Sequence, residues 1–411
     1  MAVHPLDDPG AAAVATAFDL ARLSPEFYDD PYPTFAALTA HDPVHRNADG
    51  SLILTGYADV VAMYRNPVAS SDKKVEFRPK FGDSPLYEHH TTSMVFSDPP
   101  RHTRLRRLVM GAVNQRAIAR MEPNVVALVD GLLEAMAAKG EVDLIDDFAG
   151  LIPVEVIGNL LSIPHAQRGP LRAWSLSILA ALEPVPTPQM LDRGNRALVD
   201  FKYCLKELVA DRRARPLDPE VDVLTRLIQG ESDGERLTEE ELVQNCIFLL
   251  NAGHETTTNL IGNGLELLMR FPDEQRRLRD DPSLVPSGVE EMLRFESPIQ
   301  LNNRRLLEPS EIGGRTYPAG TLVNISIGAA NRDPAQFPDP HRFDVARKPN
   351  RHVAFGQGDH ACVGMNVARM EGRVAIGRLL ARFARLEPAG APERDRRVRF
   401  RGFRHLPARV G

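Results

Sequence analysis

The sequence predicts a mainly α-helical protein with small β-sheets, and three features of its pattern support this. Residues from about 100 to 285 have the apolar spacing of helices almost throughout. One of these helices, around residues 239–270, is apolar on nearly every face and is expected to be buried. After residue 298 the pattern changes, and glycine and proline turns separate short β-like runs.

The first hundred residues are mixed. We expect helices over 33–40 and 58–66, with a short strand pair around 51–56 between them. Residues 70–97 have no clean period and are expected to form a long irregular loop. Residues 1–24 are taken as an N-terminal extension, and residues 25–411 as a single domain.

The central helix has clear boundaries. Thr238 and Glu241 form a capping box, in which each side chain bonds the other residue's backbone N–H. Phe271-Pro272 ends the helix. The segment between them corresponds to about 32 residues, or roughly 48 Å of helix. A last helix is expected over about 363–384 and a hairpin over 398–410, with irregular chain at 331–362.

Composition excludes several classes of protein. Hydrophobic residues make up 43% and charged residues 26% of the chain, as in ordinary globular enzymes. A net charge of −5 gives no indication of a nucleic-acid partner. The N-terminus has neither the basic start of a signal peptide nor an apolar run long enough for a membrane span, so we expect a cytoplasmic protein without a membrane anchor.

The three cysteines are far apart in the sequence. This spacing argues against a disulfide framework and for a reducing compartment. Cys204 and Cys246 lie in helical, partly apolar runs and are expected to be small buried hydrophobic residues. Cys362 differs, because it lies in the glycine-rich segment FGQGDHACVG, which spans residues 355–364 and comes just before the last helix.

This segment has the chemistry of a metal-ligand loop. Gly356 and Gly358 permit backbone turns that other residues avoid. A helix N-terminus after Cys362 stabilises a thiolate, which is a strong, soft ligand for iron. The alternative is a structural cysteine beside a glycine-rich turn.

Residues 355–364 match the haem-binding signature FGxGxHxCxG of the cytochrome P-450 family at every fixed position. Further motifs follow in the family's order, so the resemblance covers roughly residues 25 to 410. It implies the mainly α cytochrome P-450 fold, bound haem b and Cys362 as the iron ligand. It also implies that Phe355, Gly356, His360 and Gly364 belong to the cofactor site.

A second motif lies in the middle of the central helix, where residues 252–257 read AGHETT and resemble the family's [AG]Gx[DE]T[TS]. An interior glycine and a buried glutamate both destabilise a helix, which favours a functional reason for them. The resemblance implies that Ala252 and Gly253 leave room for O2, while Glu255 and Thr256 deliver protons. The alternative is a solvated turn in which Thr256 bonds back to its own helix.

Cationic residues are expected to bind the two haem propionates. The segment DPPRHTRLRRLV, residues 98–109, resembles the start of the family's propionate-binding helix, and it places His102 and Arg106 on one face. Arg304 and His360 match the other propionate contacts, with Arg305 as the alternative to Arg304.

Glu291 and Arg294 match the family's ExxR motif, which it pairs with a third residue that falls on Arg342. We expect a buried network that holds the cysteine loop. The alternative is a surface ion pair of little energetic weight. A further capping box is expected at Ser287 and Glu290.

The function implied is that of a monooxygenase, which inserts one oxygen atom of O2 into a small organic substrate. Electrons are expected from a ferredoxin or flavodoxin-type donor with its NAD(P)H reductase, and the protein is expected to be a monomer. Arg104, Arg107 and Arg369 are candidate docking charges, unless they only form a solvated face. A peroxide-driven peroxygenase and a haem-thiolate sensor remain as alternatives, but neither needs the Glu255–Thr256 pair.

Overall fold

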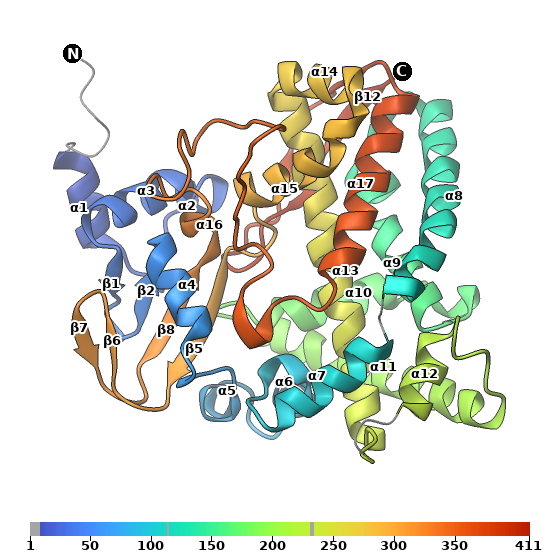
Figure 1. The fold of residues 1–411 in the computed structure, drawn as a ribbon, viewed down its shortest axis with the longest axis horizontal. Helices are drawn as coiled ribbons and strands as arrows, with labels where there is room; N and C mark the ends of the chain where they lie inside the picture. Colours follow the sequence, from blue (N-terminus) through green and yellow to red (C-terminus); the bar gives the residue numbers. More distant parts are fainter. Residues whose placement is uncertain (1–8, 113–114, 231–233) are drawn as a thin grey trace. The chain divides into compact units, whose positions relative to one another are not determined.

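The computed structural model describes residues 9–112, 115–230 and 234–411 (Figure 1). The chain divides into two compact units. The first comprises the described part of Met1–Ser71 with Asn263–Cys362 and Glu393–Arg404. The second comprises the described parts of Asp72–Gly262 with Val363–Pro392 and His405–Gly411. No helix in the described ranges is both long and apolar enough to cross a membrane.

The first unit is built around a five-stranded mixed sheet. β1 and β2 pair antiparallel, β2 and β8 pair parallel, and β8 and β5 pair antiparallel, with β3 at the edge. Leu52, Leu54, Val323 and Ile325 from β2 and β8 are fully buried in its core. In the order of the sheet, the strands are β1 (Val44–Arg46), β2 (Leu52–Leu54), β8 (Leu322–Ser326), β5 (Leu301–Leu306) and β3 (Ala69–Ser70).

The N-terminal helices pack in the same unit, and the expected helices near 33–40 and 58–66 are confirmed as α3 and α4. Ala15, which belongs to the segment expected to precede the domain, is buried in one apolar cluster with Phe27, Phe35 and Leu38. The helices are α1 (Pro9–Ala17), α2 (Pro25–Asp29), α3 (Tyr32–His41) and α4 (Tyr57–Arg65).

The remaining elements of the first unit include the ExxR helix α15. It begins before Ser287, whose hydroxyl donates to the carbonyl of Leu284, so the capping box expected there is wrong. These elements are α14 (Pro272–Asp280), η5 (Pro282–Leu284), α15 (Val285–Phe295), β6 (Ser310–Ile312), β7 (Arg315–Tyr317), α16 (Ile327–Ala330), η6 (Gly358–His360), β10 (Glu393–Arg394) and β11 (Phe403–His405), whose last residue falls in the second unit.

The second unit is mainly helical. Figure 1 shows α8 and α17 side by side, and contacts between these two helices are numerous. Its elements are α5 (Lys74–Phe81), α6 (Pro85–Thr92), η2 (Met94–Phe96), α7 (Arg101–Ala112), α8 (Gln115–Lys139), β4 (Glu141–Asp143), η3 (Ile145–Ala149), α9 (Leu151–Leu160), η4 (His165–Gln167), α10 (Leu171–Ala180), α11 (Pro188–Ala214), α12 (Val223–Gln229), α17 (Met365–Arg382), β9 (Leu386–Pro388) and β12 (Pro407–Val410).

Helix α13 (Glu239–Arg270) contributes residues to both units and has the predicted 32 residues. Its capping box is confirmed: Thr238 and Glu241 exchange backbone-to-side-chain hydrogen bonds of 3.2 Å. α14 begins at Pro272, as the predicted stop requires. Both ends of α13 are therefore set by local sequence.

Two further expectations about the fold were wrong. Residues 70–97 form α5, α6 and η2 instead of an irregular loop; Ser84 caps α6 by accepting from the N–H of Tyr87. The C-terminal hairpin is also absent from the described chain, because β11 pairs with β10 while β12 pairs with β4 and β9. The last helix is confirmed as α17.

Candidate functional site

The cysteine loop needs both of its glycines. Gly356 and Gly358 have φ values of +64° and +70°, a conformation that other residues rarely adopt. A Cβ at Gly358 would also lie 2.6 Å from the carbonyl oxygen of Tyr64 in α4. The backbone of the loop therefore packs directly against the backbone of α4, and there is no room for a side chain at Gly358.

Short turns position Cys362 within this loop. Its N–H donates to the carbonyl of Phe355 at 2.9 Å, and Ala361 donates to Gly358 at 3.0 Å. Cys362 is half-buried, and Gly364, two residues later, is the N-cap of α17. The predicted arrangement of a turn, a cysteine and then a helix start is therefore present.

The other two cysteines have environments that disfavour a thiolate. Burial raises the pKa of Cys246, in the middle of α13, to about 12. Burial and, to a lesser extent, Glu207 raise the pKa of Cys204 in α11. Both residues therefore stay protonated at neutral pH, which leaves Cys362 as the best candidate for an iron ligand.

Arg304 lies next to the cysteine loop in the first unit. Its buried guanidinium is 5.5 Å from the ring centre of Tyr64, and the same ring would be 3.7 Å from a Cβ at Gly356. Arg305 instead donates to the carbonyl of Gly320. This favours Arg304 over Arg305 as the residue beside the loop. Tyr64 was missed, because it lies within the apolar pattern of α4 like any core residue.

In the second unit, α13 carries a partly exposed stripe on an otherwise buried segment. Phe248, Leu249, Ala252, Gly253 and Thr256 are half-exposed, while residues 241–247 are buried. Their spacing of three or four places them on one helix face. This face carries Ala252 and Gly253, which the resemblance assigned to O2, and Thr256, which it assigned to proton delivery.

The polar residues of this motif differ in their surroundings. Thr256 donates its hydroxyl proton to the carbonyl of Ala252, so the expected alternative bond is present and the hydroxyl oxygen remains an acceptor. Glu255 is buried. Burial lowers the pKa of His254 to about 3, so this histidine is neutral. Ile157 of α9 occupies the space that a side chain at Gly253 would fill, so close packing of α9 requires a glycine at this position.

The expected propionate ligands of the second unit lie in α7. His102 is buried and Arg106, one turn later, is half-buried. The start of α7 is tied to α13 through Glu241, which accepts from Arg104 and lies 3.6 Å from Arg101. Arg104 is therefore engaged in an ion pair with Glu241, which makes it a weaker candidate for a docking charge.

Each unit thus brings together part of the predicted site. The first holds Arg304, Phe355, Gly356, His360 and Cys362. The second holds His102, Arg106, Ala252, Gly253, Glu255, Thr256 and Gly364. These residues fit haem: a cysteine in a glycine-forced loop suits iron, and a face with small residues suits a flat apolar ring.

Comparisons with known proteins agree with this assignment. The family model described as Cytochrome P450 matches residues 173–400. The chain belongs to the cytochrome P450 family. It is 39% identical to cytochrome P450 107B1 of Saccharopolyspora erythraea over 96% of this chain and 98% of that relative. It is 38% identical to 6-deoxyerythronolide B hydroxylase of the same organism, covering 94% of this chain and 98% of the relative.

A solved structure, P450BioI in complex with an acyl carrier protein that carries hexadec-9Z-enoic acid, matches with a TM-score of 0.89. It is 33% identical and the match covers 94% of this chain and 99% of that one. The chain therefore has the P450 fold, binds haem b through a cysteine thiolate and is a monooxygenase of small organic substrates.

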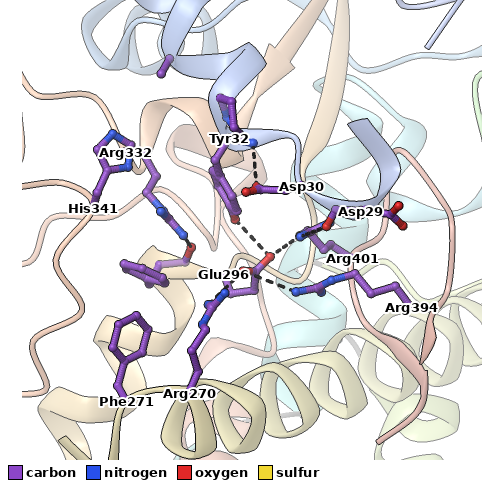
Figure 2. Close-up of a pocket in the computed structure, with 13 residues that line it drawn as sticks. Asp29, Asp30, Tyr32, Arg270, Phe271, Glu296, Arg332, His341, Arg394 and Arg401 are labelled. Atoms are coloured by element: carbon purple, nitrogen blue, oxygen red, sulfur yellow. Dashed lines mark hydrogen bonds and ion pairs between the residues drawn. The ribbon is translucent and has the colours of Figure 1, made fainter. Parts of the chain in front are cut away.

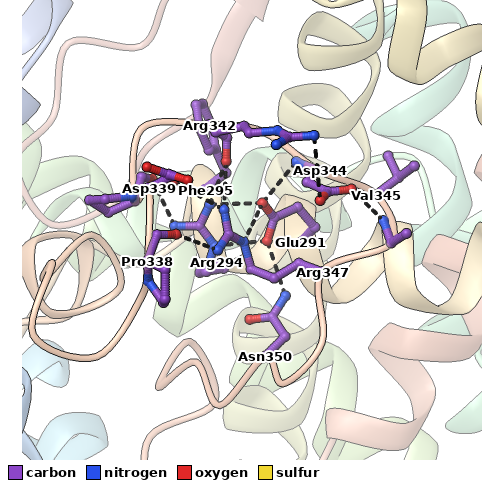
Figure 3. Close-up of polar contacts among 12 residues, drawn as sticks. Glu291, Arg294, Phe295, Pro338, Asp339, Arg342, Asp344, Val345, Arg347 and Asn350 are labelled. Atoms are coloured by element: carbon purple, nitrogen blue, oxygen red, sulfur yellow. Dashed lines mark hydrogen bonds and ion pairs between the residues drawn. The ribbon is translucent and has the colours of Figure 1, made fainter.

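The ExxR motif of this P450 forms the buried network that was expected (Figure 3). Glu291 and Arg294 are both fully buried, and two hydrogen bonds of 2.7 and 2.8 Å join them. The third residue is Arg347, whose Nε donates to Glu291 at 3.1 Å. The prediction of Arg342 is wrong, because its side chain is exposed and only its backbone carbonyl accepts from Arg294.

A separate cavity of about 490 Å³ in the first unit contains none of the predicted site residues (Figure 2). Glu296 lies at its centre and accepts from Arg401 and from the hydroxyl of Tyr32. Although burial raises the pKa of Glu296, Arg401, Arg394 and Arg332 outweigh it and lower the value to about 2. The cavity therefore contains a carboxylate that stays ionised at neutral pH and is surrounded by arginine side chains.

Proposed function

We propose that Cys362 supplies the thiolate of this monooxygenase. The observation that carries the proposal is the conformation of the loop. Gly356 and Gly358 have positive φ values, the loop packs against Tyr64, and Cys362 lies just before α17. The raised pKa values of Cys204 and Cys246 support the same choice. Phe355, Gly356 and Gly364 then shape the loop around the ligand.

The other predicted residues receive roles in binding and proton transfer. His102, Arg106, Arg304 and His360 would hold the propionates by charge-assisted hydrogen bonds. Ala252 and Gly253 would keep one face of α13 open to O2. Glu255 would pass protons to Thr256, whose hydroxyl oxygen can accept a hydrogen bond and whose own proton can turn from the carbonyl of Ala252 towards O2.

The reaction consumes one substrate molecule, O2, two protons and two electrons; one oxygen atom enters the substrate and the other leaves as water. Bound haem supplies the centre at which O2 is reduced. We assign the electrons to a ferredoxin or flavodoxin-type protein with its NAD(P)H reductase, and we place the enzyme in the cytoplasm as a monomer whose residues 25–411 form one haem domain.

The substrate is proposed to be a bulky, largely apolar natural product. The relatives include 6-deoxyerythronolide B hydroxylase and a vitamin D(3) 25-hydroxylase, which is 41% identical over 87% of this chain. The apolar Phe248 and Leu249 on the partly exposed face of α13 are compatible with such molecules. A screen of a natural-product library for ligand-induced shifts of the haem spectrum tests this class.

The thiolate assignment is tested by Cys362→His. The reduced CO complex of the wild-type enzyme should absorb far to the red of a histidine-ligated haem, and the variant should lose that band. Cys204→Ser is the matched control and should keep it. A band that persists in Cys362→His would show that another residue ligates the iron.

The two alternative functions have their own outcomes. A peroxygenase would form product faster with hydrogen peroxide than with NAD(P)H and redox partners. A sensor would form no product either with hydrogen peroxide or with NAD(P)H and the redox partners. Product that depends on NAD(P)H and the redox partners supports the monooxygenase.

A further inference from the structure

Polar side chains follow one another along a single face of α13, from its middle to its C-terminal end. Residues three or four apart lie one above the other on a helix, so a regular spacing of this kind keeps them on one face. The first four are at most 6% exposed. In order, the polar face consists of Asn251, Glu255, Asn259, Asn263, Glu266 and Arg270.

Protein groups in the described ranges satisfy only part of the hydrogen-bonding capacity of this polar face. Neither amide atom of Asn251 has a hydrogen-bond partner there, and the same holds for Nδ2 of Asn259 and Oδ1 of Asn263. Buried amide groups of this kind are normally bonded to ordered water, because leaving them unbonded is costly. The pattern therefore indicates internal hydration along the polar face.

The C-terminal end of the polar face reaches the arginine-lined cavity. Asn263 donates to the carbonyls of Arg401 at 2.9 Å and Glu296 at 3.3 Å, and both of these residues line that cavity. Figure 2 shows Arg270 extending from α13 towards Glu296. The Arg270 side chain is 43% exposed, so the polar face begins at solvent.

Glu266 is suited to exchange protons at this entrance. Its Oε2 lies 3.5 Å from Nη2 of Arg270 and makes no hydrogen bond within the described chain. Burial raises the pKa of this carboxyl, and the arginines Arg270 and Arg394 offset the effect only in part. Such a carboxyl can take up and release a proton more readily near neutral pH than an exposed one.

We propose that the polar face of α13 is a hydrated route that carries protons from the cavity at Arg270 to Glu255. The distance along the helix is about 22 Å, at 1.5 Å for each of the residues between them. Glu266 is the proton carrier at the entrance, and Asn259 is a positioning residue that orients water between Glu266 and Glu255. The inference rests on the proposed relay role of Glu255.

A high-resolution crystal structure of the haem-loaded enzyme gives a readout that does not depend on activity. Ordered waters should bridge Nδ2 of Asn259 to the carboxyl of Glu266 at normal hydrogen-bond distances. In the Asn259→Leu variant, the water bound to Nδ2 should be lost. A dry face in the wild type, with these amides bonded to protein groups, would overturn the route.

Turnover of Asn259→Leu gives a second readout. Leucine has the same number and branching of side-chain heavy atoms, but it cannot hydrogen-bond to water. Product formed per NAD(P)H should fall at least about twofold and the solvent isotope effect should rise. Haem content and the CO spectrum should stay unchanged.

Thr258→Val is the matched control, because its hydroxyl already donates to the carbonyl of His254 and is not one of the amide or carboxyl groups of the proposed route. Equal coupling in Asn259→Leu and Thr258→Val would overturn the route. Glu255→Gln separates the two proposals. Impaired coupling in Glu255→Gln with normal coupling in Asn259→Leu removes only the route, whereas normal coupling in Glu255→Gln removes the relay role itself.

Discussion

The hydroxyl of Thr256 can serve either the helix or the reaction, and the structure holds it on the helix by its bond to Ala252. Thr256→Ala should therefore leave folding, haem binding and the CO spectrum nearly intact. Proton delivery should fail more often, so product per NAD(P)H should fall roughly tenfold while hydrogen peroxide accumulates. Measuring NAD(P)H consumed, product and peroxide in one assay checks this. If the variant forms as much product per NAD(P)H as the wild type, Thr256 has no role in proton delivery and only its hydrogen bond within the helix remains.

Glu371 provides a pH-dependent prediction at the same scale. This carboxyl is buried in α17, and burial raises its pKa to about 8, which the hydrogen bond with Thr257 offsets only in part. Between its ordinary value of 4.5 and about 8, the folded protein keeps a proton that the unfolded chain releases. The contribution of Glu371 to the free energy of unfolding is therefore highest below pH 4.5. It falls as the pH rises towards 8, by at most about 1.4 kcal/mol per pH unit.

Glu371→Gln keeps a hydrogen-bonding side chain of the same size and removes this titration. Its urea midpoint should fall less between pH 5 and pH 8 than that of the wild type. The difference in unfolding free energy in favour of the variant should be largest at pH 8. Parallel midpoint curves for the two proteins would show that Glu371 does not carry the pH dependence.

At the scale of elements, the ExxR network predicts different outcomes for two nearby arginines. Arg347 donates to the buried carboxylate of Glu291, so Arg347→Ala removes a hydrogen bond to a buried charge and should cost about 1.5–3 kcal/mol of unfolding free energy. Arg342 is its control: its side chain is exposed, and Arg342→Ala should stay within about 0.5 kcal/mol of the wild type. Urea unfolding and haem content check both. Equal effects of the two substitutions would contradict the network as described.

The same pair of arginines shows how far the sequence predicts such a network. Glu291 and Arg294 are three apart on a helix, so their periodicity places them together. Their partner comes from irregular chain, where no period decides between Arg342 and Arg347. α13 was predicted correctly because its cap and its stop are local. α5 and α6 were missed because helices of eight residues have too few turns to show a period, and they depend on tertiary packing.

At the scale of the whole molecule, the predicted site residues come from two units that are interleaved in sequence. Motif spacing identified residues in both, because each motif lies within one short segment. Tyr64, which positions the loop and contacts Arg304, comes from a third segment that carries no motif. Contacts of this kind depend on the fold and have no signal in local sequence.

Electron supply by a separate protein predicts a docking surface of positive charge, and with Arg104 committed to Glu241 the exposed Arg107 of α7 is the stronger candidate. Steering by complementary charge raises association rates at low ionic strength and is screened by salt. Arg107→Glu should therefore slow reduction by an acidic ferredoxin about tenfold at low salt, and the difference should shrink as salt is added. Stopped-flow reduction under CO measures the rate.

Arg315→Glu is the control, because it makes the same charge change at an exposed residue of β7. Reduction by dithionite, which needs no docking, should be the same in all three proteins. If Arg107→Glu and Arg315→Glu slow the ferredoxin equally, net charge controls the rate and α7 is not the docking surface.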